Sequence, residues 1–308
     1  MDNSKSGRSA NSPLKMLIAV DHSEASLCAV RFACELAPTD SAIRIVSVVL
    51  LAQSILPPGD ATTTVLDSIH DDLARDATQA LSSASEICMR AGIRPETAII
   101  DLSVQGTDVV YAILDAAASW HADLIVVGAH QHHLLVRWLE GNVSEALVRF
   151  CARPMLIVPQ CSAEAPRRPD RILFAVGSVA DAQKCLRYGM RFATTASCLR
   201  AVHAVGRSVA WPGERRESIG EESAMVLEAA RQILEGFSRR TTTGTIGPSE
   251  TSDDVANAIV SEAVKWGADL LVMGTHSMHG LKRFAFGSVA HRVLHITRTP
   301  LLLVNMES

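Results

Sequence analysis

Long hydrophobic runs are missing from this sequence. A membrane-spanning helix needs about 20 consecutive apolar residues, whereas the longest apolar runs here, such as 48–52 and 124–129, have only the length of strands. Residues 1–13 are polar and contain no apolar segment ahead of a small-residue cleavage site, as a secretory signal would. We therefore expect no membrane span, a disordered tail over 1–13 and a cytoplasmic protein.

A surplus of positive charge is also missing. Lys and Arg together number 29 and Asp and Glu 33, so the net charge is -4, and the chain has only 4 Trp, 2 Tyr and 7 Phe. Proteins that bind nucleic acids use excess positive charge on the phosphates and aromatic rings for stacking on bases. The composition argues against nucleic acid as a partner.

The seven cysteines contain no C-x-x-C pair. Most of them lie among apolar residues of predicted helices, which favours buried, reduced thiols over disulfides or metal ligands. Histidines cluster in two loops, at His130, His132 and His133 and at His276 and His279. Because a zinc site needs three or four converging ligands with supporting partners, we predict no metal site.

Several catalytic signatures are absent as well. The sequence has neither the G-x-x-x-x-G-K-[ST] loop of ordinary NTPases nor the G-x-G-x-x-G fingerprint of dinucleotide oxidoreductases, and it has no G-x-S-x-G elbow. Ser23 is therefore predicted to cap a helix, and Asp123 and Asp269 to be turn or cap residues. We predict no catalytic residue.

What the sequence does contain is a long internal repeat. The segment HADLIVVGAH at 121–130 matches GADLLVMGTH at 267–276, and the same offset of 146 residues gives 12 identities over 108–130. Near the starts, LIAVDHSEAS at 17–26 corresponds to ILFAVGSVAD at 172–181. A repeat of this length indicates a duplicated domain. We predict a first domain over 14–160, a linker over 161–170 and a second domain over 171–308.

Within each copy, short β-branched runs alternate with longer amphipathic ones. In the first copy this pattern predicts strands at 15–21, 42–51, 97–102, 122–128 and 154–159, and helices at 24–37, 65–91, 107–120 and 143–151. Several strands are apolar on both faces, as expected when helices cover both sides of a parallel sheet. We predict an α/β fold of two doubly wound, five-stranded, mainly parallel sheets. Ligands bind such sheets beyond the carboxyl ends of the strands, which directs attention to Asp21, Gly128, Gly177 and Gly274.

A glycine-bearing loop follows the fourth strand of the second copy. It runs from Gly274 through Gly280 to Gly287 and Ser288, where a helix is predicted to begin. Glycines let a backbone approach an anion closely, and a helix N-terminus offers free N–H groups and a positive dipole end. The loop is therefore a candidate phosphate site. The alternative is that Gly274 only ends a strand and Ser288 only caps a helix.

Taken together, these motifs resemble the universal stress protein family in its tandem, two-domain form. The resemblance rests on AVDHSEAS after the first strand, ADLIVVG and ADLLVMG in the fourth strands, and the closing RPMLIVP and TPLLLV, and it covers about 14–305. It implies an open sheet like that of the adenine nucleotide alpha hydrolases and a cytoplasmic, non-enzymatic stress-response protein. It further implies that some members bind ATP through G-x2-G-x9-G-[ST] and an Asp at the end of the first strand.

Each copy departs from a different part of that pattern: the second copy lacks the first-strand Asp, and the first copy departs from the glycine loop. The second copy has Gly274, Ser277, Gly287 and Ser288, but Gly177 replaces its first-strand Asp. The first copy keeps Asp21 and has Gly128, Gly141 and Asn142 in the loop pattern, with Gln131 in place of the second glycine and Glu140 ahead of the helix. A Cβ at Gln131 would hinder close approach, and Glu140 would repel phosphate. The resemblance thus implies ATP or another adenine nucleotide as ligand, with the second copy favoured.

Three functional hypotheses remain open at this point. The first is a regulatory or protective stress-response module that binds an adenine nucleotide. The second is a nucleotide-independent interaction scaffold with degenerate ligand loops, whose two domains pair. The resemblance implies pairing through the closing strands 155–158 and 301–304, and it leaves association into a homodimer open. The third, a slow nucleotide hydrolase or adenylyl transferase, needs a positioned base and a metal carboxylate, and the loop of the second copy offers histidines without a carboxylate.

Overall fold

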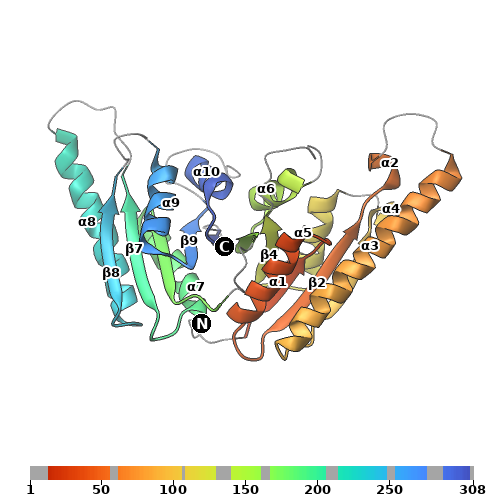
Figure 1. Ribbon diagram of the computed structural model, residues 1–308. Coiled ribbons are helices and arrows are strands. Elements are labelled where there is room, and N and C mark those ends of the chain that lie inside the picture. The colour runs from red at the N-terminus through yellow and green to blue at the C-terminus, as the bar shows by residue number, and fades with distance from the viewer. Residues whose placement is uncertain are drawn as a thin grey trace, which may run out of the picture. The chain divides into compact units, whose positions relative to one another are not determined.

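The computed structural model describes residues 13–55, 62–105, 108–129, 140–160, 167–205, 214–247, 254–275 and 287–305. The chain forms two compact units, one spanning Leu14–Arg168 and the other including Pro169–Ser308. Each unit contains a parallel β-sheet with helices on both of its faces (Figure 1). The predicted fold class of two doubly wound, five-stranded sheets is confirmed.

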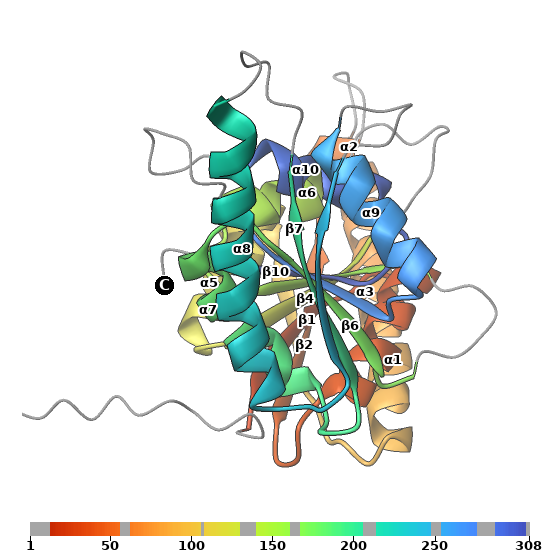
Figure 2. The same ribbon diagram turned by 90° about the vertical axis from the view of Figure 1, so that its left-hand side faces the viewer.

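The first unit alternates strands and helices in the predicted order. Its elements are β1 (Lys15–Ala19), α1 (Glu24–Leu36), β2 (Ala42–Val49), α2 (Ala52–Ile55), α3 (Thr63–Arg90), β3 (Glu96–Asp101), α4 (Leu102–Gln105), α5 (Val109–Ser119), β4 (Leu124–Ala129), α6 (Glu140–Phe150) and β5 (Met155–Pro159). The strands pair in the order β3-β2-β1-β4-β5, and all four pairings are parallel. Helices α1 and α3 pack on one face of this sheet and α5 on the other (Figure 2). The four-residue helices α2 and α4 were not predicted.

The second unit repeats this plan. Its elements are β6 (Arg171–Val176), α7 (Val179–Gly189), the 3-10 helix η1 (Met190–Phe192), β7 (Cys198–Ala204), α8 (Glu214–Glu235), β8 (Thr241–Ile246), α9 (Val255–Trp266), β9 (Leu270–Gly274), α10 (Ser288–Ile296) and β10 (Leu301–Val304). The strands pair in the order β8-β7-β6-β9-β10, again all in parallel. Among the helices of the described residues, none is both long and apolar enough to cross a membrane.

Short polar side chains and glycines set the ends of several helices. Ser23 caps α1 and Ser178 caps α7 with side-chain oxygens that accept from backbone N–H groups. The matching residues Asp108 and Asp254 cap α5 and α9 in the same way. Gly92, with φ of 78°, follows the C-terminus of α3. The cap predicted at Ser23 is confirmed.

Matching aspartates hold the amino ends of the two sheets. Asp123 Oδ2 accepts a hydrogen bond from the Lys15 N–H at 3.0 Å, and Asp269 Oδ2 accepts one from the Arg171 N–H at 2.8 Å. The side chains of Lys15 and Arg171 lie over tryptophan rings at the C-terminal ends of α5 and α9, 5.3 and 4.5 Å from the ring centroids. Both aspartates were predicted to be turn or cap residues; in the structure each binds the first residue of the neighbouring strand.

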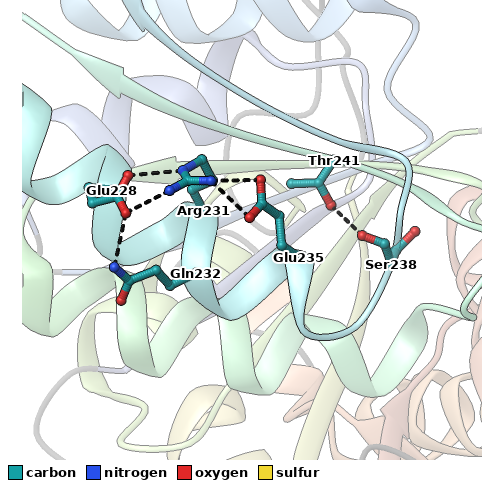
Figure 3. Close-up of polar contacts among 6 residues, drawn as sticks. All are labelled: Glu228, Arg231, Gln232, Glu235, Ser238 and Thr241. Atoms are coloured by element: carbon teal, nitrogen blue, oxygen red, sulfur yellow. Dashed lines mark hydrogen bonds and ion pairs between the residues drawn. The ribbon is translucent and has the colours of Figure 1, made fainter.

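Helix α8 shows how burial and surface charge divide between the two sides of one helix. On its exposed side, Arg231 pairs with Glu228 at 2.8 Å and Glu235 at 2.9 Å, and beyond the helix the Thr241 hydroxyl donates to the Ser238 carbonyl at 2.9 Å (Figure 3). Exposed ion pairs contribute little to stability because water screens them. The helix is instead held by apolar residues at helical spacing, which are buried: Val226, Ala230 and Leu234.

Among the six cysteines that the structure describes, one differs from expectation. Cys34, Cys88, Cys151, Cys185 and Cys198 are free thiols. Cys28, on the buried face of α1, is disulfide-bonded, so the expectation of a reduced thiol is wrong there. Spacing in the sequence gives no sign of this bond, because a disulfide depends on how close two residues lie in the folded chain.

Candidate functional site

Asp21 lies in the turn that follows β1, at the carboxyl edge of the first sheet. Its Oδ1 accepts hydrogen bonds from the Ser23 N–H at 3.1 Å and from the hydroxyls of Ser23 and Ser26. The Asp21 N–H in turn donates to Ser26 Oγ at 3.2 Å. These contacts fix the carboxylate against the first turn of α1, where the helix dipole favours negative charge.

Gly128 brings the end of β4 against that same turn. A Cβ at Gly128 would lie 2.5 Å from the Ala25 carbonyl carbon and 2.6 Å from the Ser26 nitrogen. Both are backbone atoms, which cannot rotate away as a side chain can. Glycine is therefore required by close packing of β4 on α1, and its place beside Asp21 follows from that packing.

A cavity of about 330 Å³ opens at the carboxyl ends of β1, β2 and β4. Asp21, Ser26 and Gly128 line it, so the structure brings together the two residues, Asp21 and Gly128, that the sequence singled out in the first strand and the fourth. The helices α3, α5 and α6 form its other walls, where the carboxylate of Asp76 lies among apolar residues: Leu73, Ala77, Val109, Ile113 and Val143. The combination of apolar walls and a few fixed polar groups is typical of small-molecule sites.

Gly141 and Asn142 lie in the first turn of α6, which begins at Glu140 and not at the predicted 143. The helix therefore starts three residues earlier than expected and includes both candidate residues. The N–H groups of a first helical turn have no partner within the helix, and Val143, the next residue, lines the cavity. Residues 130–139, with Gln131 and the clustered histidines of this loop, lie outside the described residues.

The second copy has a smaller cavity, of about 100 Å³, at the corresponding edge of its sheet. Gly274 and Gly287 both line it. The Gly287 N–H donates to the Thr275 carbonyl at 2.8 Å, so the expectation that this N–H is free for phosphate is wrong. Ser288 is the first residue of α10. The other two candidates, Ser277 and Gly280, lie outside the described residues.

The second copy also contains an acidic group that the sequence analysis missed. Asp181, in the first turn of α7, lines the small cavity and is only 8% exposed. A Cβ at Gly177 would lie 3.2 Å from Asp181 Oδ2. A helix-borne carboxylate thus lies beside the position where the strand-borne one is missing. The capping-box spacing from Ser178 to Asp181 was the available signal, and it indicated only a cap.

A buried histidine lies near this cavity. His203, in β7, places Nδ1 2.9 Å from Ser223 Oγ in α8 and is 8% exposed. Burial lowers the pKa of His203, while the charge of Glu222 and a hydrogen bond with the backbone of Gly177 oppose that shift. The neutral ring therefore links β7 and α8 next to Ala204, which lines the cavity. No sequence motif marked this residue.

Comparison with known proteins places these features in context. The family model described as "Universal stress protein family" matches residues 14–159 and 169–305. A universal stress protein of Mycolicibacterium smegmatis is 27% identical over 298 residues, which cover 94% of this chain and 96% of the relative. A universal stress protein of Mycobacterium bovis is 27% identical over 191 residues, or 60% of this chain, and the match spans 63% of that relative's length.

Among solved structures, a universal stress protein from Archaeoglobus fulgidus aligns with 95% of this chain and 96% of its own, with a TM-score of 0.68 and 18% identity. At that level of identity the likeness concerns the fold. It extends over both units, in agreement with the two separate segments that the family model matches.

Proposed function

This chain belongs to the universal stress protein family, and we propose that its first copy binds an adenine nucleotide as part of a regulatory or protective stress response. The observation that carries the proposal is the cavity of about 330 Å³ beside Asp21, because small-molecule sites occupy roughly 300 to 1,000 Å³. The cavity of the second copy, about 100 Å³, falls below that range. The glycine loop favoured the second copy, and that preference stays a prediction.

The lining of the larger cavity fits the parts of an adenine nucleotide. Apolar side chains from α3 and α5, such as Leu73 and Ile113, suit the faces of a flat base. Asp21 is oriented by two serines to accept hydrogen bonds from ribose hydroxyls. The first turn of α6 borders the cavity through Val143 and offers N–H groups to a phosphate.

We propose a binding role for this site and not a catalytic one. The Ser26 hydroxyl, which lines the cavity, donates to Asp21, and so does the Ser23 hydroxyl. Asp21 in turn is held as an acceptor by these donors, which suits recognition of a hydroxyl better than removal of a proton. Within the described residues, no group of three or more His, Cys, Asp or Glu is placed to hold a metal ion.

Isothermal titration of the full chain with AMP and ATP tests the proposal. Asp21→Asn removes a charge-assisted acceptor and should weaken binding about tenfold or more. The matched control is Asp181→Asn in the small cavity, which should leave affinity unchanged. The parent protein should also prefer AMP over 2′,3′-dideoxy-AMP by about tenfold, and Asp21→Asn should lose that preference.

Two results would contradict this assignment in different ways. Loss of binding in Asp181→Asn, with Asp21→Asn unchanged, would place the site in the second copy. No heat with any nucleotide at millimolar concentration would favour a nucleotide-independent interaction scaffold.

We also propose that the closing strands β5 and β10 pair with each other. Each is the last strand in its own sheet, and their sequences, MLIVP and LLLV, are apolar. An apolar strand with an unpaired edge promotes association, so pairing within one chain, or between two chains, would cover it. Hydrogen exchange of the β5 amides should be slow in a monomer isolated by sedimentation. Rapid exchange there would exclude pairing within the chain.

A further inference from the structure

Two free cysteines face each other between α1 and α3. Cys34 lies in the last turn of α1 and Cys88 in the last turn of α3, and their Sγ atoms are 3.5 Å apart. The two helices pack directly on one another. A disulfide needs an S–S distance of about 2.05 Å, so the sulfur atoms must approach by only about 1.5 Å.

The two thiols differ in access and in acidity. Cys34 is half-buried, whereas Cys88 is buried. The hydrogen bond between the two thiols lowers the pKa of Cys34, against the opposing effects of burial and of Glu35. The same contact, together with burial, raises the pKa of Cys88. The thiolate, which is the reactive form, is therefore favoured on Cys34, the cysteine that solvent reaches, over Cys88.

We propose that Cys34 and Cys88 form a redox-reactive dithiol, which a hydroperoxide closes to a disulfide between α1 and α3. The Cys34 thiolate attacks one peroxide oxygen, the O–O bond breaks, and Cys34 becomes a sulfenic acid as hydroxide leaves and takes up a proton. The Cys88 sulfur then attacks the Cys34 sulfur, the S–S bond forms, and the S–O bond breaks. The Cys88 proton leaves with that hydroxyl as water. Two thiols and one hydrogen peroxide thus give one disulfide and two waters.

None of the other described thiols combines partial exposure with membership of the Cys34–Cys88 pair. Cys151 and Cys185 are buried, and burial raises the pKa of both, that of Cys185 to about 12. Cys198, in β7 of the second unit, is half-buried like Cys34. Cys198 is therefore the matched control: its exposure is similar to that of Cys34, but it lies outside the pair of thiols between α1 and α3.

Peroxide treatment of the reduced full chain, followed by alkylation and trypsin digestion, tests the proposal by mass spectrometry. Cys34 and Cys88 fall in separate peptides, 32–44 and 76–90, and Cys28 falls in a third, 16–31. The linked pair 32–44/76–90 should accumulate at least about tenfold faster than Cys198 is oxidised. Cys198→Ser should not change that rate.

The single variants separate the two roles. In Cys88→Ser, Cys34 should stop at a sulfenic acid that dimedone traps. In Cys34→Ser, Cys88 should stay reduced on the same timescale. The proposal is overturned if Cys34 and Cys198 oxidise at equal rates in the unmodified chain, or if Cys34 proceeds to sulfinic acid without forming the linked peptide. Both outcomes are measured on the unsubstituted protein, so a folding defect in a variant cannot cause either of them.

Discussion

Replacing Gly128 by alanine should destabilise the first unit. Alanine lowers the conformational entropy of the unfolded chain, but this stabilising effect is smaller than the cost of the clash. The new Cβ would lie 2.5 to 2.6 Å from three backbone atoms of Ala25 and Ser26, a distance at which β4 and α1 must move apart. Overpacking of a core usually costs about 1 to 3 kcal/mol. Because the clash is with backbone and not with a flexible side chain, we expect the upper end, about 3 kcal/mol, or roughly a hundredfold in the folding equilibrium.

Hydrogen exchange followed by mass spectrometry measures this change in each unit separately. Peptides from β4 and α1 should exchange about a hundredfold faster in Gly128→Ala, because exchange of core amides follows the open population. Peptides from β6 and β9 in the second unit report whether the effect is confined to the first.

Gly220→Ala supplies a control of opposite sign. Gly220 lies on α8, and a Cβ there would meet nothing within 4 Å. Alanine should therefore stabilise the helix by up to about 1 kcal/mol. If Gly128→Ala lies within about 0.5 kcal/mol of the parent protein, a range typical of neutral surface changes, the close approach of β4 to α1 does not limit this position and the reasoning fails.

Three further predictions concern the second unit. Gly189→Ala should lower the stability of the second unit by about 1 to 3 kcal/mol, because its Cβ would lie 2.5 Å from Phe174 Cε1. Hydrogen exchange should become faster in that unit alone, and unchanged exchange would mean that the Phe174 ring moves aside at no cost. Hydrogen bonds from Arg231 lower the pKa of Glu228 to about 2, so their stabilising effect is lost as pH falls from about 4.3 towards 2. Carboxyl titration by NMR should show this pKa rise in Arg231→Gln, and an unaltered titration would refute the pairing. The pKa of His203 is lowered in the folded protein, so the free energy of unfolding should fall as pH drops below about 6.5. Urea unfolding between pH 7 and 5 should show a smaller fall in His203→Gln than in the parent protein. An equal fall in both would mean that other groups cause the pH dependence.

The repeat and the alternation of strands and helices sufficed to predict the fold class. Caps such as Ser23 and Gly92 were also predictable, because each acts on backbone within a few residues of itself. The cavity volumes were not predictable. They depend on how side chains such as Leu73 and Ile113, far apart in sequence, meet over the sheet.

Part of the candidate site was likewise predictable from the sequence, and part of it required the folded structure. Asp21 and Gly128 were found because they follow strands whose carboxyl ends meet at one edge. Three-dimensional placement was needed to see that the Gly287 N–H is already used by Thr275. It was also needed to see that Asp181 reaches the position beside Gly177.

The contact between Gly177 and Asp181 limits the order in which substitutions can accumulate in the second copy. An aspartate at Gly177 would place two carboxylates in contact while Asp181 remains, since a Cβ at Gly177 would lie 3.2 Å from Asp181 Oδ2. Two such groups cannot both ionise without cost. The effects of substitutions at the two positions are therefore coupled: an aspartate at Gly177 should destabilise the second unit less when Asp181 has been replaced, so one substitution does not reproduce the first copy's arrangement.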